Sequence, residues 1–264
     1  MSLELYHSVN SVCAQKVRVV LAEKGLQYRE HLMTLRGDQF DAGYMKLNPN
    51  AVVPTLVHDG RPVIESSVIL YYLDEAFPAP PLMARDLHER ARVRQFNKLV
   101  DEYVHNSCTI LTFATAFRPW FAGLSGAQIE ARLAKSPSKK RTEYKRDVAL
   151  NGLDSKFVLE ALGHHQKLLQ LMDEALARAD WLAGEAFSLA DAAVIPYILR
   201  LDLLKMAGIW EKRPRISAWY ARMRERASVK KEMLDRMTPQ DRAPFQKLEP
   251  DPWPKVRALL SEAT

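Results

Sequence analysis

A proline-rich stretch divides the sequence into two parts with different hydrophobic patterns. Residues 77–82 read Phe-Pro-Ala-Pro-Pro-Leu. Because proline disfavours helix at the residue before it, a preceding helix must end at this stiff linker. Before the linker, short apolar runs alternate with helical patterns, whereas after about Asp86 only the helical period of three to four residues occurs. The pattern predicts a small α/β domain followed by an all-α domain.

The first part predicts strands and helices in the order β-α-β followed by β-β-α. The expected strands are residues 3–6, 28–32, 55–57 and 62–64, and the expected helices are residues 12–24 and 66–77. Asp59-Gly60 separates the last two strands, and Asp-Gly between two apolar runs is a strong hairpin signal. This order predicts a small mixed sheet covered by helices.

One helix of the second part is identified by its capping residues. In the run Phe187-Ser188-Leu189-Ala190-Asp191, the Ser188 hydroxyl can cap a helix. The Asp191 carboxylate, three residues later, can accept a hydrogen bond from the Ser188 N–H. We therefore expect a capping box here, with Asp in place of the usual Glu.

Composition and charge exclude several classes of protein. The 264 residues are 47% hydrophobic and 27% charged, which is typical of a soluble globular protein. No apolar run has the length of a membrane span, and the N-terminus lacks the features of a signal peptide, so we expect a cytoplasmic protein without a membrane partner. The net charge of +6 is dispersed. The one basic cluster, at residues 139–146, predicts a solvated loop, so no nucleic-acid partner is expected.

The two cysteines indicate neither a disulfide framework nor a metal site. Cys13 and Cys108 are far apart in the sequence, and neither belongs to a Cys-x-x-Cys pair or lies near a histidine at metal-ligand spacing. A reducing compartment and the absence of a bound metal fit this pattern.

Pro54 interrupts the apolar run Val52-Val53-Pro54-Thr55-Leu56-Val57. A proline cannot donate to a sheet ladder, so within such a run it indicates an edge, a bulge or a tight turn. It is also the residue at which a cis peptide costs little, about 0.5–1 kcal/mol relative to trans. We expect the peptide groups of Val53 to remain free for another extended backbone, which would make this a peptide-docking edge.

These features together resemble the cytosolic glutathione transferase family. The resemblance rests on the β-α-β/β-β-α order, the runs VVPTL and ESS, the proline-rich linker and the SLAD run, and it covers nearly the whole chain. It implies a thioredoxin-like glutathione-binding domain at residues 1–80 and an all-helical domain with the acceptor-substrate pocket at residues 86–264. It also implies a cytoplasmic homodimer that uses glutathione as co-substrate in detoxification. In such a dimer, Asp101 would lie near the partner's glutathione.

The resemblance also assigns residues to glutathione. It implies that Val53, before a cis Pro54, pairs backbone to backbone with the cysteinyl unit. Glu65 and Ser66 would hold the γ-glutamyl end, because a helix N-terminus is a natural seat for a carboxylate. Ser66 as a plain helix cap is the alternative. The glycyl end would lie near Gln39 or Asn50.

Ser11 is the candidate for activating the thiol. A free thiol with a pKa of about 8.5 is only a few per cent ionised near neutrality, so the enzyme must stabilise the thiolate. Ser11 lies at the start of the helix at residues 12–24, and it matches the catalytic position of serine-type classes of the family. Cys13 competes with it: we expect Cys13 on the core face with Val17 and Val20. If it lay at the helix mouth, the protein would be a thiol-disulfide reductase.

The acceptor pocket is the least defined part of the prediction. The resemblance places it beside the first loop and the first long helix of the second domain, so the candidates are Cys13, Tyr103, Asn106, Ile110 and Phe113. Packing in the helical core is the alternative for Ile110 and Phe113. Trp120 or Trp253 could serve as a lid over an aromatic acceptor.

Two further readings of the function stay open. The VDEY run at residues 100–103 and the long segment at residues 118–156 resemble a bacterial branch that includes glutathione-dependent β-aryl-ether-cleaving enzymes. A non-catalytic protein that binds glutathione or another ligand is the alternative from a different class.

Overall fold

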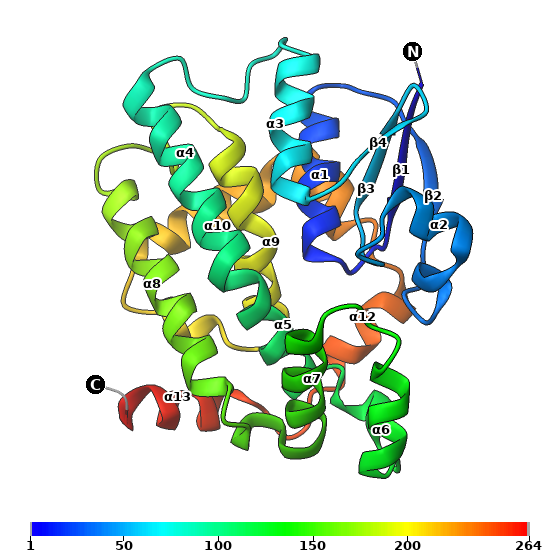
Figure 1. The fold of residues 1–264 in the computed structure, drawn as a ribbon. Helices are drawn as coiled ribbons and strands as arrows, with labels where there is room; N and C mark the ends of the chain where they lie inside the picture. The colour runs from blue at the N-terminus through cyan, green and yellow to red at the C-terminus, as the bar shows by residue number, and fades with distance from the viewer. Residues whose placement is uncertain (1, 263–264) are drawn as a thin grey trace. The chain divides into compact units, whose positions relative to one another are not determined.

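The computed structural model describes residues 2–262, which form two compact units (Figure 1). Each unit is assembled from separate segments of the chain. The first contains residues 2–97, 178–196 and 219–241, and the second contains residues 98–177, 197–218 and 242–262. No helix in residues 2–262 combines the length and the apolar character that crossing a membrane would require.

A four-stranded sheet in the order β2-β1-β3-β4 organises the first unit. The strands are β1 (Leu3–His7), β2 (Arg29–Leu32), β3 (Thr55–His58) and β4 (Arg61–Val63). β1 is parallel to β2 and antiparallel to β3, and β3 forms the expected hairpin with β4. The predicted mixed sheet is confirmed, and each strand end lies within one residue of its predicted position.

Three helices cover this sheet: α1 (Val12–Glu23), α2 (Ala42–Leu47) and α3 (Ser66–Ala76). α1 and α3 pack against each other on one side of the sheet, and α2 lies on the other side (Figure 1). Successive side chains of β1 point to opposite faces of the sheet and so contact both helical layers. Leu5 is fully buried on one face, whereas Tyr6 lies on the opposite face with Tyr44 of α2, at 5.5 Å between ring centroids.

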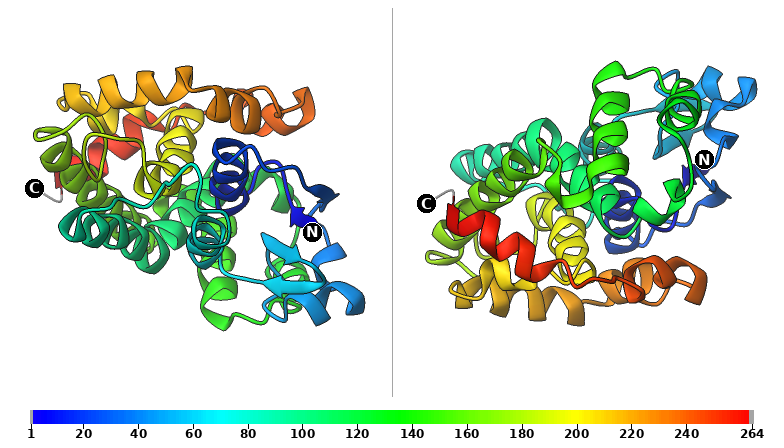
Figure 2. Two further views of the ribbon diagram at one scale, coloured as in Figure 1. Left: turned by 90° about the horizontal axis from the view of Figure 1, so that it is seen from above. Right: turned by 90° about the horizontal axis from the view of Figure 1, so that it is seen from below.

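Later segments of the chain complete the first unit. They include parts of α4 (Leu87–Leu99), α9 (Leu189–Leu203) and α10 (Pro214–Glu225). They also include α11 (Ala227–Val229), which continues into a π-helical turn at Lys230–Leu234. α11 and this turn, orange in Figure 2, pack against α1. The predicted capping box at the start of α9 is confirmed, because the Ser188 N–H donates to Asp191 Oδ2 at 3.0 Å.

The second unit is helical, as predicted. It contains α5 (His105–Ala114), α6 (Gly126–Leu133), α7 (Lys139–Asn151), α8 (Val158–Leu176), most of α12 (Pro239–Gln246) and α13 (Trp253–Glu262). α5 packs against α7 and α8, and α13 packs against α8. A π-helical turn at Val100–Val104 leads into α5.

The basic cluster at residues 139–146 is a helix, so the prediction of a solvated loop was wrong. It forms the first two turns of α7, whose N-cap Ser138 accepts a hydrogen bond from the Arg141 N–H at 3.3 Å. Tyr144, Val148 and Ala149 are buried and give the helix an apolar side. The high density of charge in the sequence hides this short apolar pattern.

Trp253 is a packing residue of the second unit, which corrects its assignment as a candidate lid. Its indole lies against the backbone of Gly208, so that a Cβ atom at position 208 would be only 2.2 Å from the ring. The Trp253 ring therefore packs α13 against the 3-10 helix at Ala207–Trp210.

We expect Gly208→Ala to destabilise the protein by about 1–3 kcal/mol, because the new methyl group must displace the Trp253 ring. The measurement is the free energy of unfolding in urea. Gly163→Ala in α8 is the matched control, since nothing lies within 4 Å of a Cβ atom at that position. It is expected to leave stability unchanged or to raise it by about 0.5–1 kcal/mol. Equal effects of the two substitutions would contradict the proposed role of Gly208.

Candidate functional site

Ser11 caps α1 and lies at the open end of the helix. Its Oγ accepts a hydrogen bond from the Ala14 N–H at 3.3 Å, and its backbone has extended dihedral angles, with φ of −75° and ψ of 114°. The side chain is half-buried. Because the hydroxyl oxygen acts as the acceptor in the cap, its hydrogen is available to donate to an anion at the helix mouth, where the helix dipole is positive.

Cys13 is half-buried in α1, and its place on the core face of this helix stays a prediction. Its neighbours Val12 and Ala14 are buried, as are Val17 and Val20. Helix α1 is buried on nearly all sides, so the period of its apolar residues does not identify a single core face.

The peptide bond between Val53 and Pro54 is cis, as predicted. Within residues 2–262, no hydrogen bond uses the N–H or the C=O of Val53. The carbonyl of the preceding residue, Val52, is bound by two side chains of the α2 region. It accepts hydrogen bonds from Asn48 Nδ2 at 3.0 Å and from the Tyr44 hydroxyl.

Tyr44 and Asn48 also contact the residue that follows Pro54. Both side chains hydrogen-bond to Thr55 Oγ1, at 2.9 Å and 3.0 Å respectively. They therefore fix the chain on both sides of the Val53-Pro54 peptide. Sequence reasoning missed them, because a tyrosine and an asparagine in an irregular stretch carry no pattern that indicates this role.

Glu65 and Ser66 form the N-terminus of α3. Glu65 is the N-cap residue and has φ of +67°, a region that a non-glycine residue enters at an energetic cost and that concentrates at functional sites. Its carboxylate is exposed and accepts a hydrogen bond from Asn50 Nδ2 at 3.1 Å. The structure thus brings together Asn50 and Glu65, two of the predicted glutathione residues. Ser66 is buried directly beside them.

Gln39 is not joined to this group. Its amide oxygen accepts a hydrogen bond from the Gly37 N–H at 3.0 Å within its own loop. No hydrogen bond in the described part of the chain joins Gln39 to Asn50 or Glu65. Gln39 therefore lies outside the hydrogen-bonded pair of Asn50 and Glu65.

Lys16 places a buried positive charge behind the start of α3. It is fully buried in α1, and its Nζ donates a hydrogen bond to Ser67 Oγ at 2.8 Å. A cation here adds to the positive end of the α3 dipole and makes the site more favourable for a carboxylate. The sequence offers no signal for this role, since a lysine in a helix is normally read as exposed.

The acceptor candidates of the second unit lie in or beside α5. Tyr103 is 41% exposed, whereas Ile110 is buried. Asn106 has the partner that a polar residue on an apolar face requires, because its Oδ1 accepts a hydrogen bond from the Tyr144 hydroxyl at 3.4 Å. Phe113 is half-buried and packs against a small apolar cluster that contains Phe121.

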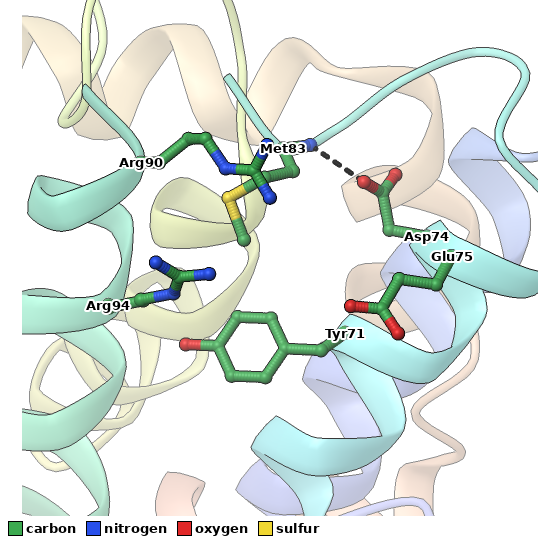
Figure 3. Close-up of a pocket in the computed structure, with 6 residues that line it drawn as sticks. All are labelled: Tyr71, Asp74, Glu75, Met83, Arg90 and Arg94. Atoms are coloured by element: carbon green, nitrogen blue, oxygen red, sulfur yellow. Dashed lines mark hydrogen bonds between the residues drawn. The ribbon is translucent and has the colours of Figure 1, made fainter. Parts of the chain in front are cut away.

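A hollow of about 150 Å³ in the first unit is separate from these residues (Figure 3). It is lined by Tyr71, Asp74, Glu75, Met83, Arg90 and Arg94. The Asp74 carboxylate accepts hydrogen bonds from the N–H groups of Leu82 and Met83 at 2.8 Å and 3.1 Å. It also pairs with Lys24 at 2.7 Å, so its role is to hold the proline-rich linker in place. None of the predicted site residues lines this hollow.

Comparison with known proteins shows which family this chain matches. The family description "Glutathione S-transferase, N-terminal domain" matches residues 10–76, and "Glutathione S-transferase, C-terminal domain" matches residues 134–227. Protein LigF of Sphingobium sp. strain SYK-6 is 28% identical over 250 residues, which cover 91% of this chain and 96% of LigF. Glutathione S-transferase Z1 of Arabidopsis thaliana is 52% identical over 92 residues, which cover 34% of this chain and 41% of that protein.

The fold comparison identifies a similar set of proteins. The crystal structure of the beta-etherase LigF from the same Sphingobium strain matches with a TM-score of 0.77 at 26% identity. The match covers 89% of this chain and 100% of the LigF chain. The similarity therefore extends through both the sheet-containing part and the helical part of the chain.

Proposed function

Because the chain belongs to the glutathione S-transferase family, we propose that it joins the sulfur of glutathione to a hydrophobic, aromatic electrophile. Glutathione is the co-substrate, and the reaction needs no metal. The Ser11 hydroxyl at the mouth of α1 is the observation that carries the proposal, because it presents a hydrogen-bond donor beside the positive end of a helix dipole. The test is turnover with a panel of aromatic electrophiles. If no member of the panel is turned over, the proposal is wrong.

The tripeptide binds along the edge at Val53. The N–H and C=O of Val53, which no group of the described chain uses, would pair with the cysteinyl unit of glutathione. Glu65 would accept from the γ-glutamyl ammonium, and Ser66 would hold its carboxylate at the start of α3. Asn50 and Gln39 are the candidates for the glycyl end.

Ser11 activates the thiol by stabilising its anion. A hydrogen bond to a charged partner contributes about 1.5–3 kcal/mol, which corresponds to about one to two units of pKa. The thiolate then attacks the electrophilic carbon. A carbon–sulfur bond forms, the bond to the leaving group breaks, and the leaving group departs with the electron pair of that bond.

We assign the acceptor to the helical part of the chain. In this division, residues 1–80 bind glutathione and residues 86–264 supply the acceptor pocket. Tyr103, Asn106, Ile110 and Phe113 are its candidates in that part, and Cys13 of α1 is a further candidate. The exposed Tyr103 and the half-buried Phe113 offer aromatic surface to a hydrophobic substrate.

Cleavage of an aryl ether is a second candidate, favoured by the similarity to the beta-etherase LigF over nearly the full chain. In this reaction the thiolate attacks the carbon that carries the aryloxy group, and a phenolate leaves. We expect incubation with glutathione and an aryloxy ketone to release one phenol per thioether formed, both quantified by chromatography. Turnover of halogenated aromatics without release of phenol from any aryl ether would remove this candidate and leave the transferase proposal intact.

We also propose that the protein is a cytoplasmic homodimer in which Asp101 lies near the partner's glutathione. Asp101 lies in the π-helical turn at Val100–Val104 and is exposed, and Cys13 and Cys108 form no disulfide within residues 2–262. Light scattering at micromolar concentration is expected to give twice the mass of the 264-residue chain. A monomer mass under these conditions would contradict the proposal.

A further inference from the structure

Arg18 of α1 is a fully buried arginine whose five N–H donors all have acceptors in the protein. Nη1 donates to Ser8 O at 3.2 Å and to His7 Nδ1 at 3.1 Å. Nη2 donates to Val9 O at 3.1 Å and to Glu232 O at 2.9 Å, and Nε also donates to Glu232 O, at 3.2 Å. The guanidinium therefore joins two separate segments of the chain, residues 7–9 and Glu232.

The first of these segments is the loop that carries Ser11. The carbonyls of Ser8 and Val9 point to Arg18, and the Ser11 N–H closes the loop by donating to Ser8 O at 3.2 Å. The Val9 carbonyl also accepts from Gln15 Nε2 at 3.3 Å. The carbonyls of Ser8 and Val9 are thus both hydrogen-bonded to side chains of α1. They lie just before Ser11, whose hydroxyl caps the helix.

His7 fixes the other side of the guanidinium. Because its Nδ1 accepts from Arg18, its proton lies on Nε2, which donates to Glu30 Oε1 at 2.8 Å. Burial, together with the charge of Arg18, lowers the pKa of His7 to about 4. His7 therefore remains neutral in the range in which a glutathione thiol titrates, and its tautomer does not change there.

The second segment comes from far along the chain. Glu232 lies in the π-helical turn at Lys230–Leu234, near the C-terminal end of that helical segment. Arg18 caps this helix end, and the Glu232 side chain pairs with Arg236 at 3.1 Å. A second tie joins the same region to the Ser11 loop, since Asn10 Nδ2 donates to Asp241 O at 3.0 Å.

We infer that Arg18 is a positioning residue for thiol activation: it clamps the Ser11 loop between α1 and the segment at residues 232–241, and so sets the Ser11 hydroxyl at the helix mouth. The inference rests on the proposed function of Ser11. It makes a segment more than 200 residues from Ser11 in sequence a structural part of the activating site. Arg18 itself touches neither glutathione nor the electrophile, and it acts only through the loop.

The test is a double-mutant cycle between Arg18 and Ser11. It measures the ultraviolet absorbance of the thiolate of bound glutathione against pH. Arg18→Lys keeps the charge but loses the planar fork that reaches several carbonyls. We expect it to raise the pKa of the bound thiol by about one unit and to lower kcat about tenfold. The KM for glutathione should change by less than about threefold, because Arg18 does not contact the tripeptide.

In the Ser11→Ala background, Arg18→Lys is expected to have no further effect, because the hydroxyl that it positions is gone. Arg226→Lys is the matched control. Arg226 donates to the Glu23 carboxylate at 2.6 Å and 2.7 Å and ties the same C-terminal region to the other end of α1, far from Ser11 along the helix. It should lower the melting temperature without moving the pKa of the thiol. If Arg18→Lys does not fold, Arg18→Gln, which buries no charge, takes its place in the cycle.

The outcomes separate the two proposals. A shift of the thiol pKa in Arg18→Lys that disappears in the Ser11→Ala background supports the inference. If Ser11→Ala raises the pKa while Arg18→Lys does not, or if the two effects add, the positioning role of Arg18 is wrong and the role of Ser11 stands. If Ser11→Ala itself leaves the pKa unchanged, the proposed activation is wrong and the positioning role is wrong with it.

Discussion

Replacement of Ser11 by alanine is expected to lower kcat by roughly ten- to a hundredfold and to leave the affinity for glutathione almost unchanged. The change removes one hydrogen bond to the thiolate, worth about 1.5–3 kcal/mol. In the proposed function, the affinity for glutathione depends mainly on the Val53 edge and on the start of α3, which the substitution does not touch. Steady-state kinetics with an activated halogenated aromatic give kcat and KM separately.

Ser8→Ala is the control for this experiment. Ser8 lies in the same loop and is also half-buried, but no hydrogen bond in residues 2–262 involves its hydroxyl. We expect its kinetics to match those of the wild type. Equal losses in Ser8→Ala and Ser11→Ala would mean that the loop is sensitive to any substitution, and the specific role of Ser11 would be wrong.

Asp191→Ala is expected to cause the largest loss of stability, at least about 3 kcal/mol in the free energy of unfolding. The fully buried carboxylate accepts hydrogen bonds from Leu182 N–H at 3.1 Å, from Trp219 Nε1 at 2.8 Å and from both the N–H and the hydroxyl of Ser188 at 3.0 Å. Burial raises the pKa of the Asp191 carboxyl, and these donors oppose that shift. Alanine would leave four buried donors without an acceptor, at about 1–3 kcal/mol each before relaxation.

Unfolding in urea, followed by circular dichroism, measures this loss. Asp180→Ala is the control, because the Asp180 side chain is 77% exposed and lies 4.0 Å from Arg222. An exposed pair of this kind contributes little, so we expect no measurable change. A loss below about 1 kcal/mol for Asp191→Ala would show that the buried donors find other acceptors, and the proposed structural role of the capping box would be wrong.

The parts of the fold that were predictable are those with strong local signals. Alternating and helical periods separated the sheet from the helices, and Asp59-Gly60 gave the hairpin between β3 and β4. Pro54 and the run that ends at Asp191 each carry a backbone constraint that few other residues could satisfy. The start of α3 at Ser66 was also predicted, because a short polar run follows a strand there.

The parts that were not predictable depend on contacts between distant segments. α1 is buried on nearly every side, so its period could not place Cys13, and it conceals two buried cations, Lys16 and Arg18. Their partners, Ser67 and the carbonyl of Glu232, lie 51 and 214 residues away in the sequence. Such contacts follow from tertiary packing, which local propensity does not describe. The helical structure of α7 was missed because its charged residues outnumber the apolar residues that form its buried side.

The most direct test of the central claim is the titration of glutathione bound to wild type, Ser11→Ala and Cys13→Ala, followed through the ultraviolet absorbance of the thiolate. We predict that the thiol pKa of the wild-type complex lies well below that of free glutathione. Ser11→Ala should raise it by about one to two units, and Cys13→Ala should leave it unchanged. The contradicting result is that Cys13→Ala shifts the titration or abolishes activity while Ser11→Ala does neither. The assignment of Ser11 would then be wrong, and the protein would be a glutathione-dependent disulfide reductase that uses Cys13.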